Sequence, residues 1–435
     1  MFKSAIKLII TKILRIEAEL VMKKYHPRVI AITGSVGKTS TKGAIAAVLS
    51  KTSSVRASGK SYNSELGVPL DILGQKTAWS SPIGWLLVLW NGFKQVFTRK
   101  EEYPKTLVLE MGVDRPGDIA RMEDLVTPDI AVVTAIGEVP VHIEFFAGSE
   151  AVAREKAKIL RFLGVRDWAI LNFDDATVYD MKEKTRSQVL TFGFGEHADV
   201  RASNYQVIYQ EDGGRAIPLG VSFKVDHQGA TVPVRIHGVF GRQQVYAALA
   251  AIAVGLAEGM NLIEISEALS LYDSPPGRLK LIEGIKGAIL LDDTYNSSPQ
   301  ALHAAIDTLR DIPAKRKIAV LGDMLELGKF TIEAHKEIGK RLKNIIDILL
   351  VVGPRSKFIA EEAREGGFEV GHIFEFSDST EAGLKLQKIM EDGDLILVKG
   401  SQSMRMERVV EEVMLHPENA DKLLVRQDAF WKSKK

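Results

Sequence analysis

The 435-residue chain contains no cysteine, which excludes disulfide bonds and thiolate metal sites. Any metal ion must therefore be held by oxygen or imidazole ligands. The absence of cysteine also fits a cytosolic protein. The chain also lacks an excess of either charge, because it has 57 basic and 56 acidic residues and a formal net charge of +1. Without a strong overall field, no nucleic-acid partner is expected.

The chain does not open on an uninterrupted apolar run. Residues 1–25 place Ile, Leu and Val at helical spacing, but lysines and an arginine interrupt them every few residues. The segment lacks the apolar core and cleavage site of a signal peptide, and it is too broken to span a bilayer. Two interpretations remain: a helix packed on the first domain, which we favour, or a peripheral membrane anchor.

Strand-like and helix-like segments alternate through the first half of the chain. The β-branched run 28–33 is followed by a glycine-rich turn and by the helical stretch 42–49. Further buried-strand candidates are 106–110, 130–134 and 168–172, with helical patterns between them such as 149–163. Continuous apolar strands that alternate with helices predict an α/β fold with a mostly parallel sheet covered on both faces.

The pattern changes after residue 193, where alternating residues and turns predict a small antiparallel subdomain over 193–241. The segment 274–277 (SPPG) is typical of a hinge into a second α/β domain of Rossmann-like type. Its strands are expected at 288–291, 317–321, 348–352 and 395–398. We therefore predict an N-terminal amphipathic helix (1–27), a central domain (28–273) and a C-terminal domain (274–435).

The segment 78–97 holds three of the five tryptophans together with several leucines and phenylalanines. It fits a helix that packs in the core, which we favour slightly, or an exposed apolar surface for a lipid-like molecule or a partner.

The loop that follows the first predicted strand is the most informative segment. It reads Gly34-Ser35-Val36-Gly37-Lys38-Thr39-Ser40 and leads into a helix. Its glycines let backbone N–H groups approach phosphates, Lys38 neutralises the β- and γ-phosphates, and a hydroxyl of Thr39 or Ser40 can ligate Mg²⁺. The loop is a short variant, because Ile32 stands where the longer GxxxxGK[ST] pattern has its first glycine. It predicts an ATP site.

Three other residues are candidates for the same site. Glu110 ends a buried strand, and the carboxyl ends of parallel strands face the ligand crevice. His142 lies in the loop after another strand end, and Lys156 lies on the helix that follows. On spacing alone, the histidine and the lysine read as structural or solvated residues.

Further motifs follow the loop in a fixed order, and together they resemble the Mur ligase family, the ATP-dependent amide ligases of peptidoglycan precursor synthesis. Within it the chain is most similar to the branch that adds D-alanyl-D-alanine. The motifs are residues 33–40 (TGSVGKTS), 63–70 (NSELGVPL), 109–112 (LEMG), 116–119 (PGDI), 277–278 (GR), 292–296 (DDTYN) with Pro299, 320–328 (VLGDMLELG) and 399–401 (KGS).

The resemblance implies roles for individual residues. Lys38 and Thr39 would hold the ATP phosphates and a first Mg²⁺, while Glu110 and His142 would ligate magnesium, with two ions expected. Lys156 matches the lysine that this family typically carbamylates, which would turn a cation into an anionic ligand for the second Mg²⁺. Lys38, His142 and Lys156 would thus form the catalytic set. Further nucleotide contacts are expected from Arg278, Asp293 and Asn296.

Two departures from the family pattern stand out. The family usually carries Gly-x-His-Asn-x-x-Asn before an alanine-rich helix, whereas this chain has Gln244 in place of the first asparagine and Ala247 in place of the second. Gln244 keeps an amide that can contact adenine or the interdomain linker. The family also has an N-terminal domain for the uridine nucleotide, and only 33 residues precede Gly34. We expect the helix 1–25 or the segment 78–97 to hold the carrier end of the substrate instead.

Three functions stay open at this point. The first is ligation of D-Ala-D-Ala to UDP-N-acetylmuramoyl-tripeptide through an acyl phosphate, by a monomeric enzyme. The second is an amide ligase of the same fold with another acyl substrate. The third is a P-loop ATPase switch, which the set of Glu110, His142 and Lys156 disfavours because a switch has no need of a carbamate lysine.

Overall fold

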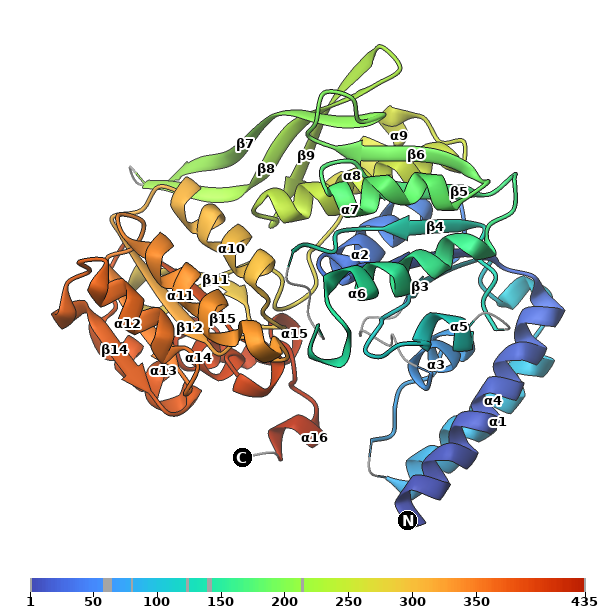
Figure 1. Ribbon diagram of the computed structural model, residues 1–435, viewed down its shortest axis with the longest axis horizontal. Coiled ribbons are helices and arrows are strands. Elements are labelled where there is room, and N and C mark those ends of the chain that lie inside the picture. The colour runs from blue at the N-terminus through green and yellow to red at the C-terminus, as the bar shows by residue number, and fades with distance from the viewer. Residues whose placement is uncertain are drawn as a thin grey trace.

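The computed structural model describes residues 2–57, 65–79, 81–122, 125–138, 143–212 and 215–433. These residues form two α/β lobes, each built on its own sheet (Figure 1). The large sheet has nine strands in the order β2-β3-β1-β4-β5-β6-β7-β8-β9, and the second sheet has six in the order β10-β11-β15-β12-β13-β14. The predicted fold class is therefore confirmed.

The large sheet is parallel through its first seven strands and antiparallel at its end. Its strands are β1 (Arg28–Thr33), β2 (Val55–Ala57), β3 (Thr106–Glu110), β4 (Ile130–Val133), β5 (Trp168–Asn172), β6 (Gln188–Gly193), β7 (Val200–Asp212), β8 (Arg215–His227) and β9 (Ala230–His237). β7 joins β6 in parallel, and β8 and β9 then pair antiparallel. The antiparallel strands expected over 193–241 are thus present, and they continue the large sheet.

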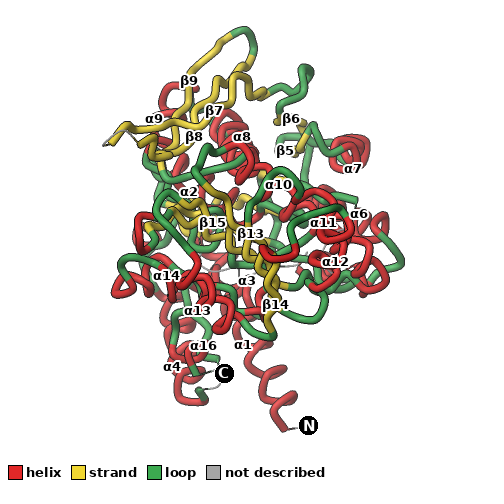
Figure 2. The backbone as a smooth tube through the Cα atoms, turned by 90° about the vertical axis from the view of Figure 1, so that its left-hand side faces the viewer, coloured by secondary structure: helices red, strands yellow, loops and turns green. Residues whose placement is uncertain are grey.

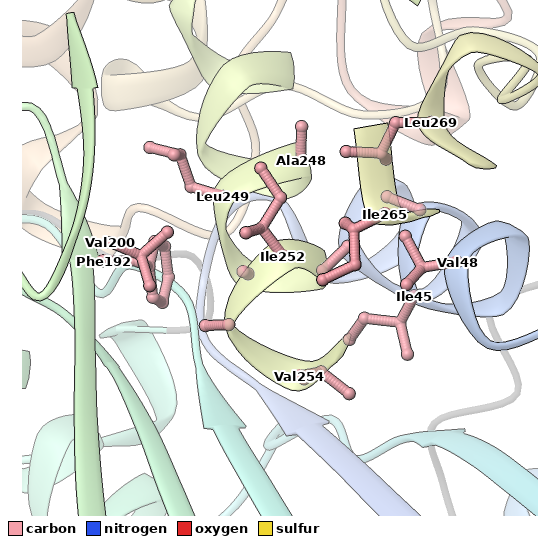
Figure 3. Close-up of a cluster of buried hydrophobic side chains, with 14 of the residues drawn as sticks. Ile45, Val48, Phe192, Val200, Ala248, Leu249, Ile252, Val254, Ile265 and Leu269 are labelled. Atoms are coloured by element: carbon pink, nitrogen blue, oxygen red, sulfur yellow. The ribbon is translucent and has the colours of Figure 1, made fainter. Parts of the chain in front are cut away.

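Strand β1 shows how the sheet is buried on both faces. Successive side chains of a strand point to opposite faces. Ile30 and Ile32 lie in one core, under α2 (Lys38–Leu49), α8 (Arg242–Ala257) and α9 (Leu262–Ser270). Figure 3 shows part of this core, where Ile45 and Val48 of α2 meet Ile252 and Ile265. Val29 and Ala31 belong to a second core on the opposite face.

That second core is covered by other helices, several of them short. They are α1 (Phe2–Tyr25), α3 (Gly67–Leu73), α4 (Pro82–Phe97), α5 (Asp118–Met122), α6 (Ser149–Ala157) and α7 (Ala176–Tyr179). Leu14, Ala18 and Val21 of α1 are fully buried, so this face of the N-terminal helix packs on the first domain, as favoured from the sequence. Its remaining face and most of α4 stay exposed.

The C-terminal sheet is parallel except for its edge strand β10, which pairs antiparallel with β11. Its strands are β10 (Lys280–Glu283), β11 (Ile289–Asp293), β12 (Arg316–Gly322), β13 (Ile348–Val352), β14 (Ile373–Phe376) and β15 (Asp394–Lys399). The helices are α10 (Pro299–Asp311), α11 (Thr331–Leu342), α12 (Lys357–Glu365), α13 (Ser379–Ile389), α14 (Glu407–Val413), α15 (Ala420–Leu423) and α16 (Ala429–Lys432). α10, α11 and α12 contribute to the core on one face of this sheet, and α13 and α14 to the core on the other (Figure 2).

The register of the central strands positions the functional site. Ile32 of β1 pairs with Glu110 of β3, and Thr33 pairs with Val133 of β4. The carboxyl ends of three neighbouring strands therefore meet where the glycine-rich loop begins. Ligands of open parallel sheets bind at such edges.

Candidate functional site

The loop between β1 and α2 depends on two glycines with positive φ. Gly34 has a φ of 144°, and Gly37, which precedes α2, has a φ of 87°. A Cβ atom on Gly34 would overlap the hydroxyl oxygen of Thr134 and would lie 3.1 Å from the carbonyl oxygen of Ala135. Only glycine therefore fits where the loop passes the end of β4.

Hydrogen bonds to the segment after β4 hold the loop in place. The Ser35 N–H donates to the Ala135 carbonyl at 2.6 Å, and the Thr134 hydroxyl donates to the Val36 carbonyl at 2.7 Å. The helical hydrogen bonds of α2 start at the Thr41 N–H, which donates to the Gly37 carbonyl at 2.9 Å. The N–H groups of the first turn thus precede the helical ladder, and such groups favour an anion.

Two lysines converge on one carbonyl of the loop. Lys38 Nζ donates to the Gly34 oxygen at 2.8 Å, and Lys156 Nζ from α6 donates to the same oxygen at 2.9 Å. Burial lowers the pKa of Lys156 well below its ordinary value, and the neighbouring Lys38 lowers it further. Burial also lowers the pKa of Lys38. The two ammonium groups crowd a buried site that suits an anion between them.

Glu110 is the carboxylate of this cluster. Its Oε2 accepts a hydrogen bond from the Thr39 hydroxyl at 3.2 Å and lies 3.3 Å from Lys42 Nζ. Burial acts to raise the pKa of Glu110, but the charges of Lys42, Lys38 and Arg278 outweigh it, and the pKa is lowered. Glu110 is therefore held as an anion beside the threonine of the loop.

Arg278 brings the C-terminal part of the chain onto the loop. Its Nη2 donates to the Thr39 hydroxyl at 3.1 Å, and its guanidinium stacks over the Tyr295 ring at 3.9 Å from the centroid. Thr39 and Arg278, which are 239 positions apart in the sequence, thus meet at the Thr39 hydroxyl. The planar guanidinium of arginine can stack on a ring and donate a hydrogen bond at the same time, whereas the ammonium group of lysine cannot.

Asp293 and Asn296 are organised by Lys399 at the end of β15. Lys399 Nζ lies 2.6 Å from Asp293 Oδ2 and donates to the Asn296 carbonyl at 2.8 Å. Both charged partners are buried. Asp293 is thereby engaged in an ion pair that fixes the loop of Asn296.

Gln244 contacts the linker between the two lobes. Its Nε2 donates to the Ser274 hydroxyl at 3.2 Å and to the Arg278 carbonyl at 2.8 Å. The amide therefore fastens the start of α8 to the hinge segment and to the backbone of the arginine that reaches the loop. Of the two contacts considered for this amide, the structure shows the one with the linker.

A cavity of about 490 Å³ lies where these groups meet. Among the predicted residues, its wall contains Gly34, Ser35, Val36, Gly37, Lys38, Thr39, Glu110, Lys156, Arg278 and Asn296. Ser40, Gln244 and Asp293 are not part of the wall. His142 lies outside the described residues, as do Asn63 and Ser64 of the 63–70 motif.

A second cavity of about 670 Å³ adjoins the first and shares Thr39, Arg278, Tyr295, Gln402 and Trp431 with it. Its wall is more apolar and includes Leu66 and Trp79 from the first lobe. Trp79 stacks on Phe430 with ring centroids 4.2 Å apart and meets Trp431 edge-on. The C-terminal segment thus reaches back across the opening to the first lobe.

The structure adds site residues that the sequence alone did not reveal: Lys42, Asp114, Ser401 and Trp431. Lys42 follows Lys38 by one helical turn, a spacing that places both on one face of α2. Asp114 comes just after a strand end, and Ser401 lies in the KGS motif. No sequence signal marked Trp431, because its position depends on how the C-terminal segment folds back.

The described residues contain no cluster of three or more His, Asp or Glu side chains that could hold a metal by themselves. The hydroxyl of Thr39 and the carboxylate of Glu110 nevertheless offer adjacent hard oxygen atoms. Mg²⁺ typically takes one or two protein oxygens and completes its shell with phosphates and water. The residues present therefore fit a magnesium ion that arrives with a nucleotide.

Comparison with known proteins gives the same family in three ways. Residues 91–255 match the Mur ligase middle domain, and residues 277–402 match the Mur ligase, glutamate ligase domain. A UDP-N-acetylmuramoyl-tripeptide–D-alanyl-D-alanine ligase from Mycobacterium leprae is 31% identical over 86% of this chain and 71% of its own. The enzyme of that name from Bacillus subtilis is 29% identical over 92% of this chain and 79% of its own.

Solved structures agree. The MurF ligase from Thermotoga maritima in complex with ADP has a TM-score of 0.74 at 27% identity and covers 92% of this chain and 83% of its own. MurF from Acinetobacter baumannii has a TM-score of 0.75 at 25% identity and covers 93% of this chain and 80% of its own.

Proposed function

The chain belongs to the Mur ligase family of ATP-dependent ligases, and on this premise we propose that it joins D-Ala-D-Ala to UDP-N-acetylmuramoyl-tripeptide. The observation that carries the proposal is the chain of contacts Glu110–Thr39–Arg278 beside Lys38 and Lys156. These contacts tie the phosphate-binding loop to the opposite lobe at the wall of one cavity. The names of the relatives supply the substrates.

The proposed reaction has two steps. A carboxylate oxygen of the acyl substrate attacks the γ-phosphorus of ATP, the bond to the β,γ-bridging oxygen breaks, and ADP leaves. The amine nitrogen of D-Ala-D-Ala then attacks the acyl carbon, inorganic phosphate departs with the C–O electron pair, and the nitrogen loses a proton. The products are an amide, ADP and phosphate.

The positive groups of the cavity suit the first step. Lys38 and the N–H groups at the start of α2 would hold the β- and γ-phosphates, and Arg278 approaches from the other lobe. Preorganised cations at the position where charge develops are among the largest contributions to phosphoryl transfer. Thr39 and Glu110 would hold Mg²⁺, which neutralises the phosphate oxygens when it is bound with ATP.

We assign Lys156 as a carbamate residue. Carbamylation requires a neutral amine, and the lowered pKa of Lys156 in its buried site favours that form. The amine would add to CO₂ and release one proton, giving an anionic carbamate beside Lys38. The carbamate would form an ion pair with Lys38, which a protonated Lys156 would repel, and its oxygens would offer a further ligand for magnesium at the cavity wall.

The second cavity is the natural place for the organic substrates. It opens next to Thr39 and Arg278 and combines apolar side chains with Arg426. The contact between Trp79 and Phe430 would help to close it and keep water from an acyl phosphate, which hydrolyses readily. Ligation with another acyl substrate is the second candidate. Most of the wall of this cavity lies outside the phosphate loop, so the ATP site does not determine which acyl group binds here.

The test is a coupled assay for phosphate release and for the amide product. With ATP, Mg²⁺ and UDP-muramoyl-tripeptide, phosphate release is expected to rise on addition of D-Ala-D-Ala, and mass spectrometry should show the pentapeptide product. D-Ala-D-Ala-dependent turnover with a different acyl donor only would favour the second candidate. Phosphate release that ignores both substrates would indicate an ATPase switch and contradict the proposal.

A further inference from the structure

An apolar surface on α4 faces solvent at the edge of the first lobe. It consists of six large side chains with exposed fractions between 48% and 73%: Ile83, Leu86, Leu87, Trp90, Phe93 and Phe97. Their spacing keeps them on one side of the helix, opposite Val88 and Gly92, which are buried. Soluble proteins rarely expose so continuous an apolar surface unless it binds a partner.

Helix α1 runs beside α4 and adds a second exposed stripe. Tyr25 Oη donates to the Gln95 carbonyl at 2.9 Å and to the Thr98 carbonyl at 2.6 Å, so the two helices end together. Figure 1 shows them side by side, with the N-terminal half of α1 extending away from the two sheets. The stripe contains Ile9, Ile13, Ile16 and Leu20, all exposed.

The charges on these two helices are mostly positive. Helix α1 carries six basic residues and two acidic ones, and α4 carries Lys94 and no acidic residue. Of the two acidic residues, Glu17 is buried and Glu19 pairs with Arg15. Lys12, Lys23 and Lys94 are exposed. The whole chain has a formal charge of only +1, so positive charge is concentrated on this helix pair.

We propose that the α1–α4 surface docks on an anionic lipid bilayer. Apolar and aromatic side chains flanked by lysines are the pattern of helices that lie in the headgroup region, where tryptophan and phenylalanine enter the acyl boundary and lysines meet lipid phosphates. None of the helices in the described residues is long and apolar enough to cross a membrane. Because the exposed stripes run along the lengths of α1 and α4, the proposed contact lays both helices along the bilayer surface.

The same charges argue against a second copy as the occupant. A two-fold contact through α4 would bring Lys94 and its neighbours against their own copies, and like charges in an interface are costly. An anionic bilayer can bind both parts of this surface, because its acyl region accepts the apolar side chains and its lipid phosphates bind the lysines beside them. The docking does not depend on the identity of the acyl substrate, so it stands apart from the proposed function.

Flotation of the purified full chain with vesicles tests the proposal. Vesicles of phosphatidylglycerol and phosphatidylcholine should carry the protein, and vesicles of phosphatidylcholine alone should carry much less, because each lysine near an anionic surface contributes about fivefold in binding. The variant L86S/W90S/F93S should reduce binding by at least about tenfold. The matched control V165S/I263S/V370S replaces three similarly exposed side chains elsewhere and should bind as the parent does.

A second variant pair tests the charges and leaves every apolar side chain of the face in place. K12Q/K23Q/K94Q should lose binding to anionic vesicles, and K315Q/K357Q/K388Q, made at exposed lysines of the other lobe, should keep it. Thermal unfolding of each variant verifies the fold. Failure of the parent to float with anionic vesicles, or equal binding by the L86S/W90S/F93S variant, would overturn the proposal. So would a dimer in light scattering that this variant dissolves while vesicle binding is absent.

Discussion

Replacing Gly34 with alanine tests whether the phosphate loop is shaped by its contact with β4. Alanine at a φ of 144° adopts a backbone conformation that costs roughly 1–3 kcal/mol. The added methyl group also overlaps the Thr134 hydroxyl and crowds Ala135, and overpacking of this kind costs about 1–3 kcal/mol. We expect Gly34→Ala to lower the free energy of unfolding by about 2–6 kcal/mol and to weaken ATP binding.

A matched control separates the two contributions. Gly148 also has a positive φ, 107°, but a Cβ atom there meets nothing within 4 Å. Gly148→Ala should therefore show the backbone cost alone, and ATP affinity should stay near that of the parent. Urea denaturation measures stability, and calorimetric titration measures nucleotide affinity.

A double-mutant cycle with Thr134 completes the experiment. Thr134→Ala alone loses the hydrogen bond to the Val36 carbonyl, about 1 kcal/mol. It also removes the atom that an alanine at position 34 would strike. Gly34→Ala should consequently cost roughly 1–2 kcal/mol less in the Thr134→Ala background than in the parent. Additive costs would refute the argument that this contact selects glycine.

Three other substitutions probe the site. Lys156→Ala should nearly abolish ligation in the product assay, while its ATP affinity stays within a few-fold of that of the parent. A native mass spectrum of the parent that shows no mass increase from bound CO₂ would reject the carbamate. Arg278→Lys should lower kcat by about tenfold or more, because lysine cannot both stack on Tyr295 and reach Thr39; unchanged steady-state kinetics would contradict that role. Burial raises the pKa of Asp292 to about 6, above its unfolded value, so its ionisation opposes folding as the pH rises from about 4 to 6. Between pH 5 and pH 7 the free energy of unfolding of the parent should therefore fall by roughly 1 kcal/mol, a loss that Asp292→Asn should not show in urea denaturation. Equal pH profiles of the two proteins would count against the raised pKa.

The phosphate loop could be predicted because its determinants are local. A β-branched strand, two glycines and a helix start lie within residues 28–49, and the strand end at Glu110 obeys the rule for parallel sheets. The helical face of α1 that carries Leu14 and Val21 followed from periodicity as well.

The remaining features depend on how distant segments meet. Arg278 reaches Thr39 only because the hinge turns the C-terminal lobe toward the loop, and Trp79 meets Phe430 only because the chain end folds back. Periodicity also could not decide which apolar face of α4 would be covered, since both faces carry large side chains. Lys42 could not be predicted because a lysine on a helix usually faces solvent, and its burial accompanies an ion pair with Glu110, which comes from the distant strand β3.

The most direct test of the ligase assignment is a single-turnover experiment with [γ-³²P]ATP, Mg²⁺ and UDP-muramoyl-tripeptide, followed by addition of D-Ala-D-Ala. In the absence of the amine, an acyl phosphate should form, which borohydride traps as the corresponding alcohol. Addition of D-Ala-D-Ala should convert it into the pentapeptide with release of one labelled phosphate per amide formed. Release of labelled phosphate at the same rate without the tripeptide substrate, and no trapped alcohol with it, would contradict the account.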